Sequence, residues 1–361
     1  MSSADLDVAI VGAGQAALAL AHGLRGSGLD YACLGADARI GDSWRRRWDS
    51  LRLFTPAQYD GLPGLPFPAP HDHYPGKDEV ADYLEAYSSH FALPVRLDTR
   101  VTRTERDEHS FILSTGHDEI RAQQVVLATG SYGAPWTPAF ADRLAPAIVQ
   151  LHAAHYRRPD ALPGGRVTIV GSGASGLQIA AELAATHSVT LCIGRRQPRL
   201  PQRLLGRDIW FWLERTPNVP ADTWLGRHLA RKEPVVGEGP RALARRGVKL
   251  AARATGADGS ALHLADGTRL PVTTVVWATG HRHALDWVDL PVRDPHGAPL
   301  HHDGRSPVPG LYFLGLRWMR SRGSSLLGWV GEDAAYIAGQ LRMRALARPM
   351  RRGTSDGRGT E

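Results

Sequence analysis

Two glycine-rich stretches of this sequence have the residue types and the spacing that hold a dinucleotide pyrophosphate. They read Gly12-Ala13-Gly14-Gln15-Ala16-Ala17 and Gly171-Ser172-Gly173-Ala174-Ser175-Gly176. In such G-x-G-x-x-(G/A) turns the first glycine permits a sharp turn, and the second lets backbone N–H groups approach the pyrophosphate. The third small residue lets the following helix pack on the strand. The residues expected to contact a dinucleotide are therefore Gly12, Gly14 and Ala17 at the first site, and Gly171, Gly173, Ser175 and Gly176 at the second.

The two stretches lie in matching surroundings. Each follows an apolar run, 8–11 or 167–170, and each opens into the Ala/Leu-rich spacing of a helix. Cys33 lies 21 residues after Gly12 and Cys192 lies 21 residues after Gly171, each inside a second apolar run. One glycine-rich turn is weak evidence, but two in register predict two dinucleotide sites.

Two further apolar runs end in the same three small residues. These are Ala128-Thr129-Gly130 and Ala278-Thr279-Gly280. Small residues at the end of a buried strand let the returning chain touch a bound dinucleotide. We therefore expect all six to contact the cofactors.

The ends of the second apolar runs differ between the two copies. An acid at this place suits a free ribose hydroxyl, whereas a guanidinium suits a 2′-phosphate. The first copy has Gly35 there, and we interpret Asp37 as the substitute acid; a merely solvated acid is the alternative. The second copy has Arg195-Arg196, for which two solvated arginines are the alternative. The difference predicts FAD at the first site and NADPH at the second.

The length and the repeat predict the domain organisation. A chain of 361 residues has room for about two domains. The repeated Ala-Thr-Gly strand end at 278–280 marks the return of the chain to the first domain. We therefore predict an α/β fold of two Rossmann-like domains, the second inserted into the first. The FAD domain is expected at 1–150 and 282–345, the NADPH domain at 151–281, and a disordered tail at 346–361. Strands are expected over 95–104 and 110–114.

Composition excludes several other functions. The net charge is +7, but the basic residues are scattered and only three are lysines, so we expect no nucleic-acid partner. Two cysteines at equivalent strand positions, without a C-x-x-C motif, indicate small core residues and no redox-active dithiol. None of the 16 histidines has metal-ligand spacing. No signal peptide or membrane span is expected, which indicates a cytoplasmic protein without a membrane partner.

Three other segments carry a resemblance to a known family. Residues 40–56 match the pattern G-G-x-W-R-x-R-(W/Y)-D-S-L-x-L, with Asp42 in place of the second glycine. Residues 151–156 resemble an H-S-x-x-Y linker, and residues 310–334 resemble a segment that covers a flavin. On these motifs the chain resembles flavin-dependent monooxygenases of the flavin-containing and YUCCA-like (class B) type, above all their short bacterial relatives. The resemblance extends from Val8 to about Leu341.

The resemblance implies roles for residues near the flavin. Trp44 and Arg45 would lie near the FAD phosphates and the flavin ring, and Thr55 would contact the cofactor. A helix beginning near Gly331 would direct its N-terminal dipole at the flavin. Other members carry an Asn or a Lys near Pro56 and Ala57 to assist the oxygen intermediate, and here Gln58 is the nearest candidate for that catalytic role.

The chemistry that the resemblance implies is oxygenation of a small organic substrate with dioxygen. NADPH would reduce FAD, the flavin would trap dioxygen as a C4a-hydroperoxide, and one oxygen atom would pass to a nitrogen or sulfur atom of the substrate. Tyr156, where a tryptophan would be typical of Baeyer–Villiger enzymes, favours heteroatom oxygenation. A reductase or dehydrogenase without oxygen insertion, and a non-catalytic dinucleotide-binding protein, are the alternatives. The oligomeric state is left open, with a homodimer as one possibility.

Overall fold

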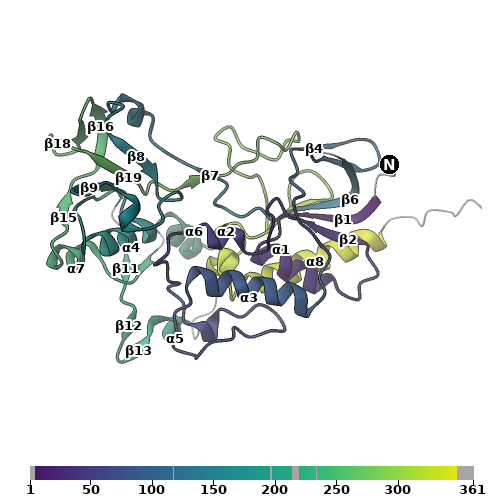
Figure 1. The fold of residues 1–361 in the computed structure, drawn as a ribbon. Helices are drawn as coiled ribbons and strands as arrows, with labels where there is room; N and C mark the ends of the chain where they lie inside the picture. The colour runs from purple at the N-terminus through teal and green to yellow at the C-terminus, as the bar shows by residue number, and fades with distance from the viewer. Residues whose placement is uncertain (1–4, 117, 196, 214–218, 233, 348–361) are drawn as a thin grey trace, which may run out of the picture.

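The computed structural model describes residues 5–116, 118–195, 197–213, 219–232 and 234–347 of the chain. These residues form two lobes, each around its own sheet (Figure 1). The chain enters the second lobe near strand β7 (Ala134–Pro135) and leaves it near β20 (His281–Arg282), and these two strands pair antiparallel. The second lobe is therefore inserted in the first, which confirms the predicted α/β fold of two Rossmann-like units.

The sheet of the first lobe has the strand order β3-β2-β1-β6-β5-β4, and β21 also pairs with β6. Its strands are β1 (Asp5–Val11), β2 (Tyr31–Leu34), β3 (Val95–Arg96), β4 (Arg103–Arg106), β5 (Phe111–Ser114), β6 (Glu119–Leu127) and β21 (Leu311–Phe313). The pairs β1–β2, β1–β6, β2–β3 and β6–β21 are parallel. Because both faces of this parallel part are covered, its central strands are almost continuously apolar.

One strand prediction is wrong. The segment 95–104 is not one strand: Val95–Arg96 pairs parallel with β2, and β4 begins only at Arg103. Between them the chain passes through Asp98, whose φ of 50° lies in the left-handed region. Asp tolerates this conformation in turns, and the alternating pattern of side chains concealed the break. The antiparallel meander predicted here consists instead of β4, β5 and the first half of β6.

The sheet of the second lobe is parallel, with the order β15-β10-β9-β19-β8. Its strands are β8 (Val149–His152), β9 (Arg166–Val170), β10 (Ser188–Cys192), β15 (Lys249–Ala251) and β19 (Thr274–Trp277). The predicted domain boundary at 151 thus falls inside β8. A small antiparallel sheet of β16 (Ala254–Asp258), β17 (Ala261–Leu264) and β18 (Arg269–Pro271) belongs to the same lobe. Two short strand pairs also belong to this lobe. They are β11 (Arg199–Leu200) with β14 (Val235–Val236), which is parallel, and β12 (Arg203–Leu204) with β13 (Arg207–Asp208), which is antiparallel.

The α-helices of the described residues are distributed over both lobes (Figure 1). They are α1 (Gln15–Leu24), α2 (Asp42–Arg45), α3 (Lys77–His90), α4 (Ala174–Leu183), α5 (Ile209–Leu213), α6 (Trp224–Arg231), α7 (Pro240–Arg245) and α8 (Val330–Leu346). In the first lobe α1 lies beside α8 (Figure 1). The start of α8 at Val330 confirms the helix predicted near Gly331. The helix extends to Leu346, and residues 348–361 of the predicted tail lie outside the described residues.

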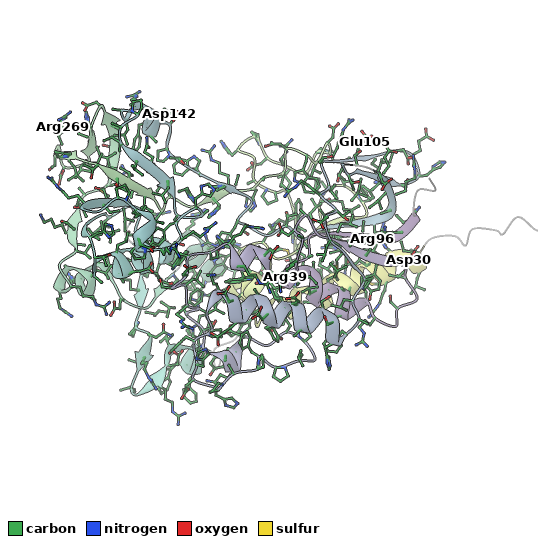
Figure 2. The ribbon with its side chains drawn as sticks, viewed as in Figure 1. Asp30, Arg39, Arg96, Glu105, Asp142 and Arg269 are labelled. Atoms are coloured by element: carbon green, nitrogen blue, oxygen red, sulfur yellow. The ribbon has the colours of Figure 1, made fainter. Side chains whose placement is uncertain are left out.

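Charged side chains are spread over both lobes, as the sequence predicts (Figure 2). Arg269 and Asp142 of the second lobe, and Asp30, Arg39 and Arg96 of the first, are all exposed. Basic and acidic side chains also pair across the surface, as in Arg39–Glu85 at 2.7 Å and Arg269–Asp258 at 2.7 Å. Within the described ranges, no helix is both long and apolar enough to cross a membrane.

Candidate dinucleotide and active site

The first glycine loop joins β1 to α1. Gly12 has a φ of 125°, and a Cβ there would lie 2.7 Å from the carbonyl oxygen of Ala128. The position is therefore restricted to glycine by conformation and by the close approach of the Ala-Thr-Gly strand end. Gly14 is the N-cap of α1, which has no side-chain cap and no acid in its first turn. Ala17 is fully buried, and its carbonyl oxygen lies 3.7 Å from the Cys33 sulfur on β2.

The second glycine loop joins β9 to α4 in the same way. Gly171 has a φ of 115°, and a Cβ there would clash with the carbonyl oxygen of Ala278. A Cβ at Gly176 would clash with the carbonyl oxygen of Gly171, which is the close helix-to-strand packing expected of a third glycine. Gly173 caps α4, again without a side-chain cap or an acid in the first turn.

The backbone hydrogen bonds of the two loops repeat. Gly12 N–H donates to Leu34 at 2.9 Å and Gly171 N–H to Cys192 at 3.1 Å. The strand ends repeat as well, because Ala128 N–H donates to Val11 and Ala278 N–H donates to Val170, each at 2.9 Å. The predicted Ala-Thr-Gly residues thus lie beside their glycine loops, with Gly130 and Gly280 at φ values of 73° and 91°.

Both loops have room for a ligand at the expected place. A Cβ added at Gly14 or at Gly173 would have no protein atom within 4 Å. The N–H groups of the first turns of α1 and α4 are free of side-chain caps, and such helix ends favour an anion. The residues of both loops therefore fit a dinucleotide pyrophosphate.

The end of β2 explains why no acid stands at residue 35. A Cβ at Gly35 would lie 2.9 Å from the Cβ of Ala13 in the first glycine loop, so a larger side chain would displace that loop. Asp37 follows in the next turn, and its carboxylate pairs with Arg46 at 2.9 Å. In the second lobe Arg195 is exposed after β10, and Arg196 lies outside the described residues. The assignments of Asp37 and of the arginine pair stay predictions.

The segment with the family motif connects the lobes. Trp44, on α2, packs against the cores of both lobes, and Trp48 and Leu51 are buried in the core of the second. The Arg45 guanidinium, however, lies among the carboxylates of Asp82 at 2.9 Å and Glu85 at 3.0 Å. Its charge is neutralised by α3, so this geometry does not favour the contact with FAD phosphates that the resemblance implies for Arg45.

The residues after this motif form a buried polar pair. Thr55 is 5% exposed and its Oγ1 donates to Asp60 Oδ1 at 2.6 Å. Asp60 Oδ2 is buried and has no hydrogen-bond partner within the described chain. Burial raises the pKa of Asp60 to about 7, against the smaller effect of the Thr55 hydrogen bond. Gln58, on the intervening 3-10 helix Ala57–Tyr59, is exposed, and its catalytic role stays a prediction.

The start of α8 packs against the same segment. A Cβ at Gly328 would clash with the carbonyl oxygen of Tyr59, and a Cβ at Gly331 would lie 2.5 Å from the Pro63 ring. The first turn carries Asp333, which is 2% exposed and pairs with Arg320 at 3.2 Å. Glycine at 328 and 331 thus permits the close approach of α8 to residues 59–63, whereas the contact of Gly331 with the flavin stays a prediction.

Side chains at the crossing between the lobes hold the second Ala-Thr-Gly. Thr279 Oγ1 donates to the carbonyl oxygen of Trp136, and His152 Nε2 lies 2.9 Å from the carbonyl oxygen of Gly280. His281 stacks edge-on against His152 with ring centroids 5.0 Å apart. Burial, followed by His152 and the nearby Arg47, lowers the pKa of His281 to about 4. Burial lowers the pKa of His152 as well, so both imidazoles are uncharged at neutral pH.

A cavity of about 280 Å³ lies between the lobes. The first lobe contributes Leu53 and Phe54 to its wall, and the second contributes the face of α4 that begins at Ala174, directly after Gly173. Two amides of the second lobe fix this wall: Gln178 donates to the Arg52 carbonyl at 3.2 Å and Gln202 to the Phe54 carbonyl at 3.0 Å. The cavity therefore adjoins the second glycine loop and the segment that leads to Thr55.

The two cysteines are core residues. Both are buried, in β2 and β10, and burial raises the pKa of each thiol to about 12. The nucleophilic thiolate is thus strongly disfavoured, which agrees with the predicted absence of a redox-active dithiol.

Sequence reasoning missed two charged residues, the buried Asp60 and the partly buried Arg199. Asp60 stands in a loop with many prolines and glycines, where an acid is ordinarily solvated. Arg199 is one of many arginines, and its position over the second glycine loop depends on the pairing of β11 with β14. Neither residue belongs to a spacing pattern that would mark it in the sequence.

Comparisons with known proteins agree with this geometry. Residues 9–204 match the model of the family described as pyridine nucleotide-disulphide oxidoreductase. An uncharacterized CzcO-like oxidoreductase of Geobacillus kaustophilus is 38% identical over 341 residues, which cover 93% of this chain and 98% of that protein. The solved structure of a flavin-containing monooxygenase from Stenotrophomonas maltophilia superposes with a TM-score of 0.81 at 30% identity, covering 95% of this chain and 99% of that one. A probable indole-3-pyruvate monooxygenase of Arabidopsis thaliana, YUCCA9, is 30% identical over 216 residues, which cover 55% of this chain and 49% of that protein.

Proposed function

We propose that this chain, which belongs to the class B flavin-dependent monooxygenases, is an NADPH-dependent enzyme that transfers one oxygen atom from dioxygen to a small organic substrate. Flavin monooxygenases of this family use FAD and NADPH. One observation carries the proposal. Two glycine loops of matching geometry, each with open space at its second glycine, occur in a chain that matches a flavin-containing monooxygenase along nearly its whole length.

The first lobe would hold FAD. The pyrophosphate would contact the N–H groups at Gly14 and the first turn of α1, and Ala128, Thr129 and Gly130 would border it from β6. Asp37 would accept a hydrogen bond from a ribose hydroxyl. Its carboxylate would then interact with both the ribose and Arg46. Trp44 and Thr55 would lie toward the flavin.

The second lobe would hold NADPH at Gly173 and the first turn of α4, bordered by Ala278, Thr279 and Gly280. Arg195 and Arg196 would bind the 2′-phosphate, since a guanidinium matches a phosphate with two parallel hydrogen bonds. This contact would select NADPH over NADH.

The cofactor supplies the redox chemistry: FAD, when bound, accepts a hydride from NADPH and activates dioxygen. The chain contributes positioning and exclusion of water. The packing of α8 on residues 59–63 closes one side of the first lobe, and the buried Thr55–Asp60 pair keeps the neighbouring segment rigid. Gln58 would offer an amide donor to the oxygen intermediate. Tyr156, at the place where a tryptophan would indicate Baeyer–Villiger chemistry, supports a nitrogen or sulfur atom as the acceptor.

Isotope incorporation tests the proposal. Purified protein should carry yellow FAD, and NADPH with ¹⁸O-labelled dioxygen should convert an amine or thioether into a product that contains one labelled oxygen atom. A flavin-loaded protein that consumes NADPH but oxygenates none of a broad set of substrates would be a reductase. A protein that purifies without flavin, and takes up none, would contradict both readings.

A further inference from the structure

The second glycine loop has an arginine on it that the sequence patterns do not reveal. Arg199 opens β11, and its Nη2 donates to the carbonyl oxygen of Ser172 at 3.3 Å. Ser172 stands between Gly171 and Gly173, so the guanidinium lies directly against the turn. Its Nη1 is buried and finds no hydrogen-bond partner among the residues that the structure describes.

The ion pairing of Arg199 differs from that of Arg45 and Arg320. No carboxylate in the described ranges forms an ion pair with it, whereas Arg45 pairs with Asp82 at 2.9 Å and Arg320 pairs with the buried Asp333 at 3.2 Å. Burial lowers the pKa of Arg199, and no neighbouring acid opposes this effect. A guanidinium nevertheless stays protonated in proteins, so a partly buried cation without a partner is unfavourable in the unliganded chain.

The fold fixes the guanidinium in this place. Arg199 pairs with Val235 across β11 and β14, which sets its backbone. A Cβ at Gly239, the N-cap of α7, would lie 3.0 Å from Arg199 Cδ, so the glycine leaves room for the arginine stem. The adjacent Glu238 is held by Arg246 at 2.6 Å. The surroundings therefore accommodate the cation without neutralising it.

We propose that Arg199 binds the pyrophosphate of the second dinucleotide; this inference rests on the proposed binding of NADPH to that lobe. Two positive features converge there with the Arg199 side chain: the uncapped first turn of α4 and the N–H groups at Gly173. A pyrophosphate bridging them would give the buried Nη1 an acceptor and the partly buried cation a counter-charge. Arg199 lies at the turn, whereas the 2′-phosphate is expected at the end of β10 beside Arg195, so the pyrophosphate is the group within its reach.

Binding of the oxidised nucleotides to flavin-loaded protein tests this without turnover. NADP⁺ and NAD⁺ would be titrated calorimetrically into wild type, Arg199→Met and Arg203→Met at constant ionic strength. Arg203 is the matched control, because it is an exposed arginine in the same segment whose guanidinium donates to the Gly206 carbonyl. Arg199→Met should weaken NADP⁺ and NAD⁺ by the same factor, about ten- to a hundredfold, because both contain the pyrophosphate. Arg203→Met should bind both like wild type.

Three results would overturn the inference. Binding by Arg199→Met equal to wild type would show that the side chain does not contact the ligand. A loss confined to NADP⁺ would assign Arg199 to the 2′-phosphate instead. A wild type that binds neither nucleotide would overturn the proposed function and this inference together, whereas the first two results would leave the proposed function intact.

A second variant and a second readout keep the test independent of folding. Arg199→Lys keeps the charge but loses the bidentate fork, so it should weaken both nucleotides equally but less than Arg199→Met. Without nucleotide, Arg199→Met should melt no lower than wild type, because it removes a partly buried charge that forms no ion pair within the described residues. The nucleotide-induced rise in melting temperature should shrink in both Arg199 variants, and an undiminished rise would again overturn the inference.

Discussion

Asp60 should make the protein less stable as the pH rises, because its carboxyl group is buried with one oxygen unpartnered. The residue is 1% exposed, and only Oδ1 accepts a hydrogen bond, from Thr55. The nearby Tyr83 phenol donates to the carbonyl oxygen of Leu65. No cation of the described part of the chain offsets the ionised form, and burial raises the pKa from 3.8 to about 7.

The raised pKa fixes the sign and the size of the effect. The protonated carboxyl is favoured in the fold, so its contribution to stability is fully present below pH 3.8 and is lost as the pH rises through about 7. One pKa unit corresponds to ~1.4 kcal/mol. Integrated from pH 5 to pH 8, ionisation of Asp60 should lower the free energy of unfolding by about 3 kcal/mol.

The substitution Asp60→Asn removes the titration while keeping the shape and the acceptor for Thr55. Urea unfolding of wild type and Asp60→Asn would be followed by circular dichroism at several pH values across that interval. Asp72→Asn is the matched control, because Asp72 is an exposed aspartate of the same loop region. Other groups with shifted pKa values, such as Asp333 and His281, are present in all three proteins and cancel in the comparison.

The stability advantage of Asp60→Asn over wild type should grow with pH, and that of Asp72→Asn should not. A pH-independent difference between wild type and Asp60→Asn would refute the reasoning, since it would mean that Asp60 does not ionise differently in the folded and unfolded chains. A difference that grows toward low pH would refute it as well, because it would indicate a carboxylate stabilised by an unseen cation.

Three further predictions concern the cofactors. Gly14→Val should abolish FAD binding and Gly173→Val should abolish NADPH binding with flavin retained, because a side chain at either position meets no protein atom and occupies only ligand space; flavin absorbance and nucleotide titration measure the two losses. Arg195→Ala should weaken NADPH by about tenfold and leave NADH unchanged, as followed by anaerobic flavin reduction; an equal loss with both would contradict a 2′-phosphate contact. Gln58→Ala should raise the hydrogen peroxide released per NADPH consumed, and unchanged coupling would remove Gln58 from the mechanism.

The fold could be predicted from the sequence because its determinants are local and repeated. A dinucleotide-binding glycine loop requires a positive φ at its first glycine and a close approach of the neighbouring strand end. Only glycine satisfies both requirements, and each copy shows the necessary glycines within six residues of sequence. The helix α8 was expected on other grounds, from the resemblance of residues 310–334 to a flavin-covering segment, and it begins at Val330. The strand proposed over residues 95–104 was not, since the break at Asp98 depends on a turn that alternation of side chains does not reveal.

The site was less predictable, because its charges are arranged by long-range packing. The motif predicts that Arg45 faces the cofactor, yet Asp82 and Glu85 of α3 surround its guanidinium. Conversely, Asp60 and Arg199 look like ordinary surface residues in the sequence. Asp60 is buried by the close approach of Gly328 and α8. Arg199 is partly buried by its pairing with β14 and by the room that Gly239 leaves for it. All of these neighbours are distant along the chain.

The two loops are alike in geometry, so discrimination between the two dinucleotides must lie outside them. In the first lobe Ala13 of the glycine loop lies against Gly35, so residue 35 at the end of β2 has no room for an acidic side chain. The acid that we expect to replace it, Asp37, is paired with Arg46. The second has exposed Arg195 at the strand end and Arg199 against the turn. Loop substitutions should therefore remove a nucleotide altogether, whereas substitutions at the strand ends should change which nucleotide binds. This follows because the N–H groups of a glycine loop meet only the pyrophosphate, which both dinucleotides share.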